Sequence, residues 1–378
     1  MKKIIILAAS SLVTTSVFAQ SSVTLYGTVD DGFAFANNQS GGRSYQLMQG
    51  ALGSSKWGFL IREDLGGGYS AVARLENGFD INSGKLGNNG RLFGRQAYVG
   101  VNTPYGSVLL GRQYDLVADA MLFAASSLKF AGIWGAHVAD VDNIWCTYSM
   151  NNAVKYISPT FGGFKGAALF SFGGVAGDFS NGKKESGMLS YNYKNFDASV
   201  VFSRINNPAT SIYDGAADPV AGGTFTNTVT PPAYSGYASA GSVQVMGAAV
   251  NYKILGASIG AEYTNTRYQN VVKTSSTPFS GTATFNTFDV NATYLVTPTV
   301  LVGAGYTYSK AETAKYGQLN LGAQYFLSKR TSLYTVAAWQ RAIGTDSTGK
   351  SAVAQIYGLT PSSTGNQVAI RVGIRHNF

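Results

Sequence analysis

The sequence is short of charged side chains, of cysteine and of histidine. Charged residues make up 12 % of the 378 residues, about half of the ~25 % that is usual in a soluble domain. The single cysteine, Cys146, excludes an intrachain disulfide, and we expect it to be a small residue within a strand. The two histidines, His137 and His376, have no metal-ligand spacing and no nucleophile motif accompanies them. We therefore expect no enzymatic activity, no metal and no cofactor.

After residue 19 the chain lacks any run of about 18 apolar residues, which excludes a membrane-spanning helix. The first nineteen residues have a different character. They combine a positive start, an apolar stretch at 4–9 and a small-residue cleavage site at 17–19. We expect residues 1–19 to be a cleaved signal peptide and residues 20–378 to form one exported domain.

Acidic residues are fewer than basic ones. The whole chain has 28 Lys and Arg against 19 Asp and Glu, and loss of Lys2 and Lys3 with the signal peptide leaves 26 against 19, a net charge of +7. A basic excess suits nucleic acid, an acidic surface or anionic solutes. Export and the absence of any Lys/Arg run argue against nucleic acid, so the role of each basic residue depends on where it points.

What the chain has in quantity is glycine, tyrosine and phenylalanine, with 46, 23 and 21 residues, in segments where apolar and polar residues alternate. A period of two is typical of strands that face water on one side only. We expect sixteen strands from this pattern. They lie near 22–36, 53–63, 69–79, 92–103, 107–114, 145–157, 164–173, 187–194, 196–205, 243–253, 256–267, 286–296, 300–310, 316–328, 331–343 and 366–378.

The connections between these segments alternate in length. Short ones, such as 64–68 and 103–106, carry the Gly, Pro and Asn of tight turns. Long connections lie near 37–52, 80–91, 115–144, 174–186, 206–242, 268–285, 311–315 and 344–365. Short–long alternation with an even strand count is the mark of an up-and-down barrel. The sequence therefore predicts an all-β fold, a sixteen-stranded antiparallel transmembrane β-barrel.

The last segment indicates which face of the strands meets lipid. Arg371 and Arg375 alternate there with Val372 and Ile374. The alternation alone would also suit a soluble sandwich with its apolar face inward. An arginine that faces lipid at mid-membrane costs about 2–4 kcal/mol, whereas one in a water-filled lumen costs little. We therefore expect both arginines to face a lumen and the apolar face to point outward.

Several short motifs in a fixed order resemble those of the trimeric sixteen-stranded general porins of Gram-negative bacteria, especially the betaproteobacterial branch. The resemblance covers the whole exported chain. The motifs are SVTLYG at 22–27, KWGF at 56–59 through EDLGGGY at 63–69, GRQYD at 111–115, NN at 151–152 through YISP at 156–159, and RHNF at 375–378.

The resemblance implies an outer-membrane channel with an inward-folded third loop at 115–144. It implies basic residues at the constriction, here Arg112 and Lys56, and it places Ser149 where an arginine is common. Lys155 shares the face of Ser149, and Lys129 stands in the loop where an acid is common. The resemblance further implies a homotrimer in lipopolysaccharide-containing lipid, and a terminal Phe378 that the barrel-assembly machinery reads.

We expect the lumen to be positive and the channel to prefer anions. The polar strand faces carry the proposed lining, in which Arg62 shares the side of Lys56 and Arg74 is neutralised by Glu76. The remaining candidates are Arg112, Lys129, Ser149, Lys155, Arg371 and Arg375. We assign the basic residues of the long loops to the rim, beside lipopolysaccharide; they are Arg43, Arg91, Lys183, Lys184, Lys273 and Lys350.

Two other functions remain open at this point. Trp134 and Trp145 bracket part of the third loop and would suit a substrate-specific channel for a sugar or an organic anion. The long connection at 206–242 would suit a surface adhesin or receptor. The favoured expectation is a passive diffusion channel for small hydrophilic solutes and ions in the outer membrane.

Overall fold

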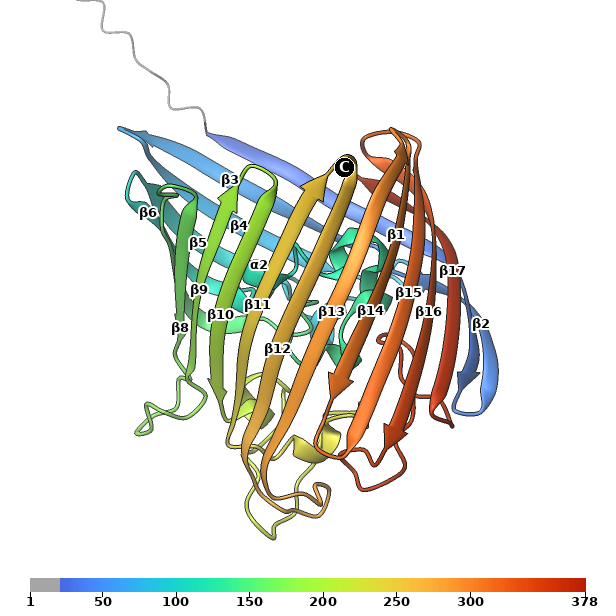
Figure 1. Cartoon of the computed structure of the whole chain (residues 1–378). Helices are drawn as coiled ribbons and strands as arrows, with labels where there is room; N and C mark the ends of the chain where they lie inside the picture. Colours follow the sequence, from blue (N-terminus) through green and yellow to red (C-terminus); the bar gives the residue numbers. More distant parts are fainter. Residues whose placement is uncertain (1–20) are drawn as a thin grey trace, which may run out of the picture.

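The computed structural model describes residues 21–378, so the predicted signal peptide at 1–19 lies outside the described residues. Seventeen strand segments form one antiparallel sheet that closes on itself, because β17 (Asn366–Asn377) pairs with β1 (Ser22–Gln39). Figure 1 shows the barrel, with tight turns and the C-terminus at one end and the long loops at the other. The other strands are β2 (Gly42–Gln49), β3 (Lys56–Gly66), β4 (Tyr69–Gly78), β5 (Gln96–Thr103), β6 (Gly106–Gln113), β7 (Met150–Ile157), β8 (Phe164–Ser171), β9 (Lys184–Tyr193), β10 (Phe196–Asn206), β11 (Ser242–Ile254), β12 (Ala257–Val271), β13 (Gly281–Thr297), β14 (Val300–Lys310), β15 (Ala314–Phe326) and β16 (Thr331–Gly344).

The seventeen strand segments occupy sixteen positions around the barrel, because β2 and β3 follow each other in a single position beside β1. The first part of β1 pairs with β3 and its second part with β2. The predicted sixteen-stranded barrel is therefore confirmed, but the predicted loop at 37–52 was too long, since most of it is strand. Only residues 50–55 interrupt this position. Asp30 holds the interruption in place, because its Oδ2 accepts hydrogen bonds from the backbone N–H groups of Leu52 at 2.8 Å and Gly53 at 3.2 Å.

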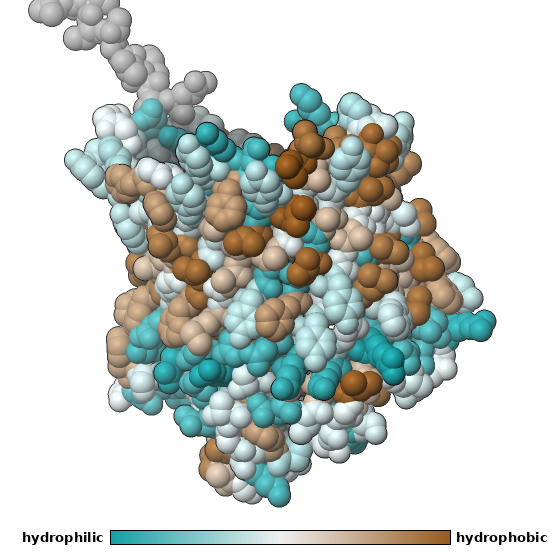
Figure 2. Space-filling view, in the orientation of Figure 1, coloured by the Kyte–Doolittle hydropathy of each residue, from teal (hydrophilic) through white to brown (hydrophobic). Residues whose placement is uncertain are grey.

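The outer surface of the strands is apolar. In β17, Val372 and Ile374 are 60 % and 48 % exposed, whereas Arg371 beside them is fully buried. Apolar residues form a broad band over the strands in Figure 2, and hydrophilic residues gather toward the long-loop end. This surface matches a barrel whose outer face contacts acyl chains.

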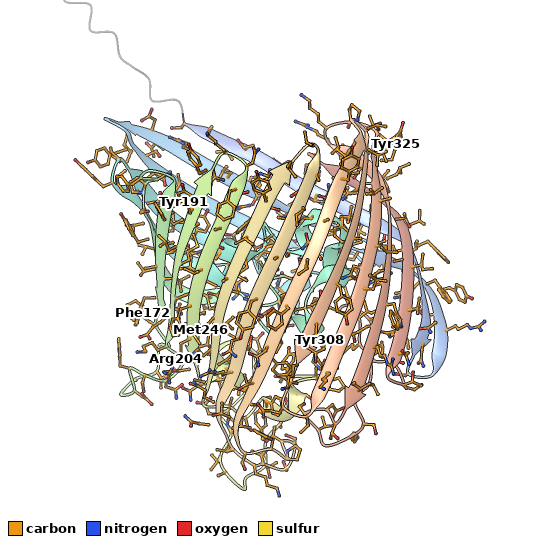
Figure 3. All side chains as sticks on the ribbon, in the orientation of Figure 1. Phe172, Tyr191, Arg204, Met246, Tyr308 and Tyr325 are labelled. Carbon is orange, nitrogen blue, oxygen red and sulfur yellow. The ribbon has the colours of Figure 1, made fainter. Side chains whose placement is uncertain are left out.

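Aromatic side chains lie toward both ends of the apolar band. In Figure 3, Tyr191 and Tyr325 lie toward the tight-turn end, whereas Phe172 and Tyr308 lie nearer the long loops. Tyr325 and Phe172 are about half exposed on the outer surface. Rings of amphipathic aromatics at the two interfaces are typical of outer-membrane barrels.

The segment between β6 and β7, residues 114–149, lies inside the barrel, and we call it the inward segment. It contains the four short helices α2 (Leu116–Met121), η1 (Ser127–Ala131), η2 (Gly132–Gly135) and η3 (Val138–Asp140). Its packing partners are the inner faces of β8–β11 around α2 and of β14–β16 around η1. The remaining short helices, α1 (Gly87–Gly90), α3 (Pro208–Ser211) and η4 (Ser235–Tyr237), lie in other loops.

The inward segment is longer than the sequence predicted. The expected strand at 145–157 begins only at Met150, so Cys146 lies in the inward segment and the prediction that it sits within a strand was wrong. Its φ of +62° is incompatible with a regular strand. Among the described residues no helix is long and apolar enough to cross a membrane.

Glycines on the inner wall make room for the inward segment. A Cβ at Gly322 would lie 2.8 Å from the ring of Phe130, and a Cβ at Gly303 would overlap the same ring. A Cβ at Gly305 would overlap Ser126 in the same way. Because these positions carry no side chain, the part of the inward segment around η1 lies flat against β14 and β15. The opposite wall, made by β3–β7 together with β17 and β1, is left to line the open lumen.

Candidate functional site

The inward segment covers the carboxylates of the wall against which it lies. Ser126 donates a hydrogen bond to Oδ1 of Asp289 at 3.0 Å, and Nδ1 of His137 lies 2.6 Å from Oδ2 of Asp142. The carboxylate of Glu262 lies 3.8 Å from Nε2 of His137, and all these side chains are buried. Burial alone would lower the pKa of His137. The attraction of the adjacent Asp142 carboxylate works against this, and together with the other nearby carboxylates it raises the pKa to about 10. The protonated imidazole therefore offsets part of this negative charge, which does not face the lumen.

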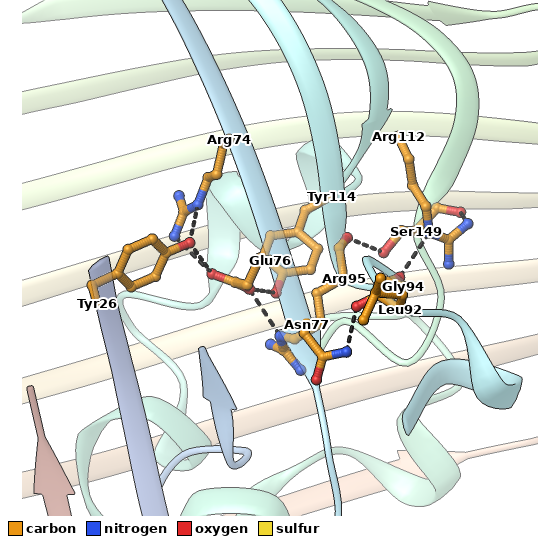
Figure 4. Close-up of polar contacts among 10 residues, drawn as sticks. All are labelled: Tyr26, Arg74, Glu76, Asn77, Leu92, Gly94, Arg95, Arg112, Tyr114 and Ser149. Carbon is orange, nitrogen blue, oxygen red and sulfur yellow. Dashed lines mark hydrogen bonds and ion pairs between the residues drawn. The ribbon is translucent and has the colours of Figure 1, made fainter. Parts of the chain in front are cut away.

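On the opposite wall, the buried Glu76 organises a group of basic and aromatic side chains (Figure 4). Its Oε2 lies 2.8 Å from Nη2 of Arg74 and accepts a hydrogen bond from Tyr26 at 2.7 Å. Its Oε1 lies 2.9 Å from Nε of Arg95 and accepts a hydrogen bond from Tyr114 at 2.8 Å. The predicted pairing of Arg74 with Glu76 is therefore present. One carboxylate thus positions two guanidinium groups on the lumenal wall.

Two cations that we expected to line the constriction are instead buried in ion pairs. Nη2 of Arg371 lies 3.2 Å from Oδ1 of Asp30, and both side chains are fully buried. Nζ of Lys155 lies 2.7 Å from Oδ2 of Asp119 and donates to the carbonyl of Tyr114 at 2.8 Å. The expectation that Arg371 and Lys155 contact lumenal water is corrected. Alternation identifies an inner face, but it does not show which inner side chains are covered by other groups.

Arg112 is turned into the barrel by an irregularity in β6. Regular alternation would place it beside Leu110, which is 48 % exposed on the outer surface. The pairing of β6 with β7 shifts register after Gly111, whose φ is +133°. The guanidinium of Arg112 then donates to the side chain of Asn151 and, at 3.4 Å, to the carbonyl of Ser149. Ser149 thus contributes a backbone acceptor to Arg112.

Lys129 points toward the wall, because its Nζ donates to Oδ1 of Asn251 at 2.9 Å and to the carbonyl of Ser258 at 3.1 Å. Arg62 is exposed near the tight-turn end of β3. Lys184, which we expected in a loop at the rim, is buried at the start of β9.

One cavity of about 270 Å³, which we call the constriction cavity, is lined by three cations that keep N–H groups without a protein acceptor. They are Lys56, Arg95 and Arg375, and we call them the lumenal cations. Within residues 21–378, Nζ of Lys56 makes no hydrogen bond, Arg375 has a buried Nε without a partner, and Arg95 uses only its Nε. The one carboxylate on the lining is Asp119, which is already paired.

The inward segment supplies an apolar side to the constriction cavity. Ala118, Leu122, Leu128 and Trp145 line it there. Leu128 is 51 % exposed although it lies within the barrel. The lining of the cavity therefore combines cations from outside the inward segment with apolar side chains of the inward segment.

Two smaller cavities continue from the constriction cavity toward the long loops. A cavity of about 190 Å³ shares Arg95 with it, and a cavity of about 70 Å³ shares Thr147 with the second. The third is lined by Arg91 and Arg112, together with Asp214, which lies 2.8 Å from Nη2 of Arg91. Basic side chains thus accompany the whole series of cavities.

Sequence reasoning missed Arg95. In the predicted strand at 92–103 it is in phase with the outward Val99, so alternation placed it on the lipid side. β5 begins only at Gln96, one residue after Arg95, and the backbone N–H of Arg95 bonds to the carbonyl of Glu76. The Gly94 that precedes Arg95 is the one local signal of this late start.

The sequence profile of the family described as Gram-negative porin matches residues 6–345. The chain belongs to this family. The porin is 28 % identical to outer membrane porin protein 32 of Delftia acidovorans over the full length of both chains. Its fold is similar to that of the anion-selective porin from Comamonas acidovorans, with a TM-score of 0.72, 22 % identity and coverage of 95 % and 100 %. The trimer form of OmpT from Vibrio cholerae is similar as well, with a TM-score of 0.61, 17 % identity and coverage of 95 % and 99 %.

The chain is therefore an outer-membrane porin whose barrel forms a diffusion channel for small hydrophilic solutes. Family and fold indicate a channel rather than an enzyme. Within residues 21–378, no group of three or more His, Cys, Asp or Glu side chains is arranged to hold a metal ion.

Proposed function

We propose that this porin prefers anions and that the lumenal cations set the preference. The observation that carries the proposal is the set of free N–H donors that Lys56, Arg95 and Arg375 present to one cavity. Basic side chains that ring a narrow pore select anions. Apolar walls of low dielectric strengthen the field close to them.

Charge pairing elsewhere in the barrel leaves the lumenal cations as the main source of anion preference. Apart from Arg62, which is exposed near the tight-turn end, the other inward cations bond to carboxylates, carbonyls or amides of the protein. Most inward carboxylates are paired or covered by the inward segment. Screening over about 8 Å at physiological ionic strength removes the influence of distant loop charges. The anion-selective porin from Comamonas acidovorans, by its name, has the property proposed here, and its similar fold supports the proposal.

The reversal potential of the purified porin across a KCl gradient in a planar bilayer tests the proposal. We expect the sign of an anion-selective channel, and we expect Lys56→Gln to move the potential toward zero. Lys350→Gln is the matched control, because Lys350 is exposed in a long loop outside these three cavities. A cation-selective sign, or equal effects of the two variants, would overturn the proposal.

We also propose that the porin is a homotrimer that sits in lipopolysaccharide-containing lipid. The likeness to OmpT of Vibrio cholerae, which is described in a trimer form, supports this assembly. Two exposed cations, Arg43 at the start of β2 and Lys350 in a long loop, are suited to lipopolysaccharide phosphates. Light scattering of the detergent-solubilised porin should give three times the mass of one exported chain, and a single-chain mass would contradict the trimer.

We propose Phe378 as the signal that the barrel-assembly machinery reads. Its backbone N–H and carbonyl both bond to Gly27 at 3.0 Å, and its side chain is 42 % exposed at the end of the barrel. This exposure leaves the ring accessible to a partner. Deletion of Phe378 should reduce the amount of folded porin in the outer membrane, whereas Phe378→Tyr should retain most of it. Equal amounts from the deletion and from the unaltered chain would contradict the assignment.

A further inference from the structure

The constriction cavity has a chemistry that anion preference alone does not require. Preference for anions needs only positive potential, which the lumenal cations supply. The cavity also exposes apolar surface of the inward segment. Apolar side chains exposed to lumenal water are unfavourable unless a ligand covers them.

Leu128 is the clearest case. It is 51 % exposed, whereas its neighbours Ser127 and Phe130 are buried against the wall. Leu122 and Trp145, also of the inward segment, line the same cavity, so Leu128 is one of several apolar side chains there. The helix η1 that carries Leu128 is fixed by Phe130 beneath it, and the surface is therefore held in place rather than free to collapse.

The cationic side has the opposite requirement. Nε of Arg375 is buried without an acceptor, and Nζ of Lys56 makes no hydrogen bond within the described part of the chain. Buried donors normally have acceptors in native proteins. A carboxylate that enters the cavity would supply acceptor oxygens to these groups and to the terminal nitrogens of Arg95, which are the strong, charge-assisted kind of hydrogen bond.

We propose that the constriction cavity is a binding site for a small carboxylate with an apolar body, such as an aromatic monocarboxylate. Its carboxylate would lie against the lumenal cations and its ring against Leu122, Leu128 and Trp145. An inorganic anion would leave the apolar side in water, and an uncharged aromatic would leave the donors without acceptors. The inference rests on the proposed anion preference and adds a solute class to it: simple ions pass without retention, whereas amphipathic carboxylates are held briefly.

Conductance titrations in planar bilayers test the site with three probes. Benzoate carries both the charge and the ring, formate carries the charge alone, and benzamide carries the ring with no charge. We expect benzoate to block KCl conductance saturably, at a concentration at least tenfold below any block by formate or benzamide. Equal block by formate and benzoate, or no saturation with benzoate, would overturn the inference.

Leu128→Ser and its matched control separate this site from a nonspecific effect. We expect Leu128→Ser to raise the half-blocking concentration of benzoate about tenfold, which corresponds to about 1.4 kcal/mol. Leu60→Ser is the control, because Leu60 faces the lumen in register with Arg74 but does not line the cavity. Leu60→Ser should leave the block unchanged. Equal sensitivity in the two variants would overturn the site.

The reversal potential of the same channels distinguishes failure of this inference from failure of the proposed function. An anion-selective channel without benzoate binding would refute the inference alone. A cation-selective channel would refute the proposed function as well, whatever benzoate does.

Discussion

The ring of Phe130 occupies the space in which a side chain at Gly303 would lie. Phe130 belongs to η1 of the inward segment, and Gly303 belongs to β14 of the wall beneath it. Phe130 is fully buried in this contact. The width of the lumen therefore depends on the absence of a side chain at a residue on the far wall, more than 170 positions along the chain.

We expect Gly303→Ala to lower single-channel conductance, because the added methyl group would push Phe130 and the inward segment toward the lumenal cations. Overpacking of this kind costs roughly 1–3 kcal/mol of stability. The double variant Gly303→Ala with Phe130→Leu should recover part of the conductance. Gly187→Ala is the control, since a Cβ at Gly187 would meet nothing within 4 Å. Unchanged conductance in Gly303→Ala would show that the contact does not set the lumen width.

Two arginines of β17 should respond differently to the same substitution. Arg371→Gln would leave the buried Asp30 without its cation, and breaking a buried pair costs about 3–5 kcal/mol. Arg375→Gln would remove a lumenal cation and reduce anion preference with a smaller loss of stability. Thermal unfolding followed by gel shift, together with reversal potentials, measures both effects. Similar stability losses in the two variants would contradict the assigned roles.

Cys146 offers a native probe of the lumen, because it is the only cysteine and lies on the lining of the constriction cavity. Burial raises the pKa of its thiol to about 12, so the reactive thiolate is scarce at neutral pH. Between pH 8 and 10 its labelling rate should rise about 100-fold, against about fourfold for a thiol with a pKa of ~8.5. Levelling off near pH 9 would contradict this environment.

The charge of the labelling reagent gives a second reading at Cys146. A methanethiosulfonate that carries a sulfonate should react faster than one that carries a trimethylammonium group, because the lumenal cations attract it. Reaction with Cys146→Ser protein gives the background. Equal rates for the two reagents would count against a positive constriction.

Asp214 lowers the positive charge at the long-loop mouth, and its removal should strengthen anion preference. Its hydrogen bond with Arg91 holds the pKa of Asp214 below the usual value. The pair is therefore intact above about pH 5 and is lost only as the pH falls through that lowered pKa. Asp214→Asn should shift the reversal potential at pH 7, and this difference from the unaltered porin should persist through the range in which an ordinary Asp carboxyl protonates and shrink only at still lower pH. Asp178→Asn, in a loop away from the cavities, is the control and should have no effect.

Alternation along the strands was sufficient to predict the barrel and its outward face. Val372 and Ile374 are on the lipid side, as predicted, because a period of two survives wherever a strand is regular. The pattern failed where the backbone departs from regularity. The bulge after Gly111 turned Arg112 inward against its phase, and the late start of β5 did the same for Arg95.

The candidate site could be predicted less well than the fold. The sequence indicated Lys56 and Arg375 as inward cations, and both line the constriction cavity. It gave no means to see that Asp30 would neutralise Arg371 or that Lys129 would bond to the wall, since both depend on partners far apart in the chain. The apolar part of the cavity lining could not be predicted either. Leu128 faces the cavity because Phe130, on the same helix, packs into the barrel wall.

The bonds that Asp30 makes have a consequence for the assembly of the barrel. Its carboxylate binds Arg371 of β17, accepts a hydrogen bond from Tyr334 of β16 at 2.6 Å and caps the interruption after β2, so it joins the two ends of the chain across the closing seam. A nascent barrel that still lacks its final strand carries this carboxylate without its counterion. Closure and charge neutralisation are therefore one event, and a chain that ends before Arg371 would keep an unpaired carboxylate at its open seam.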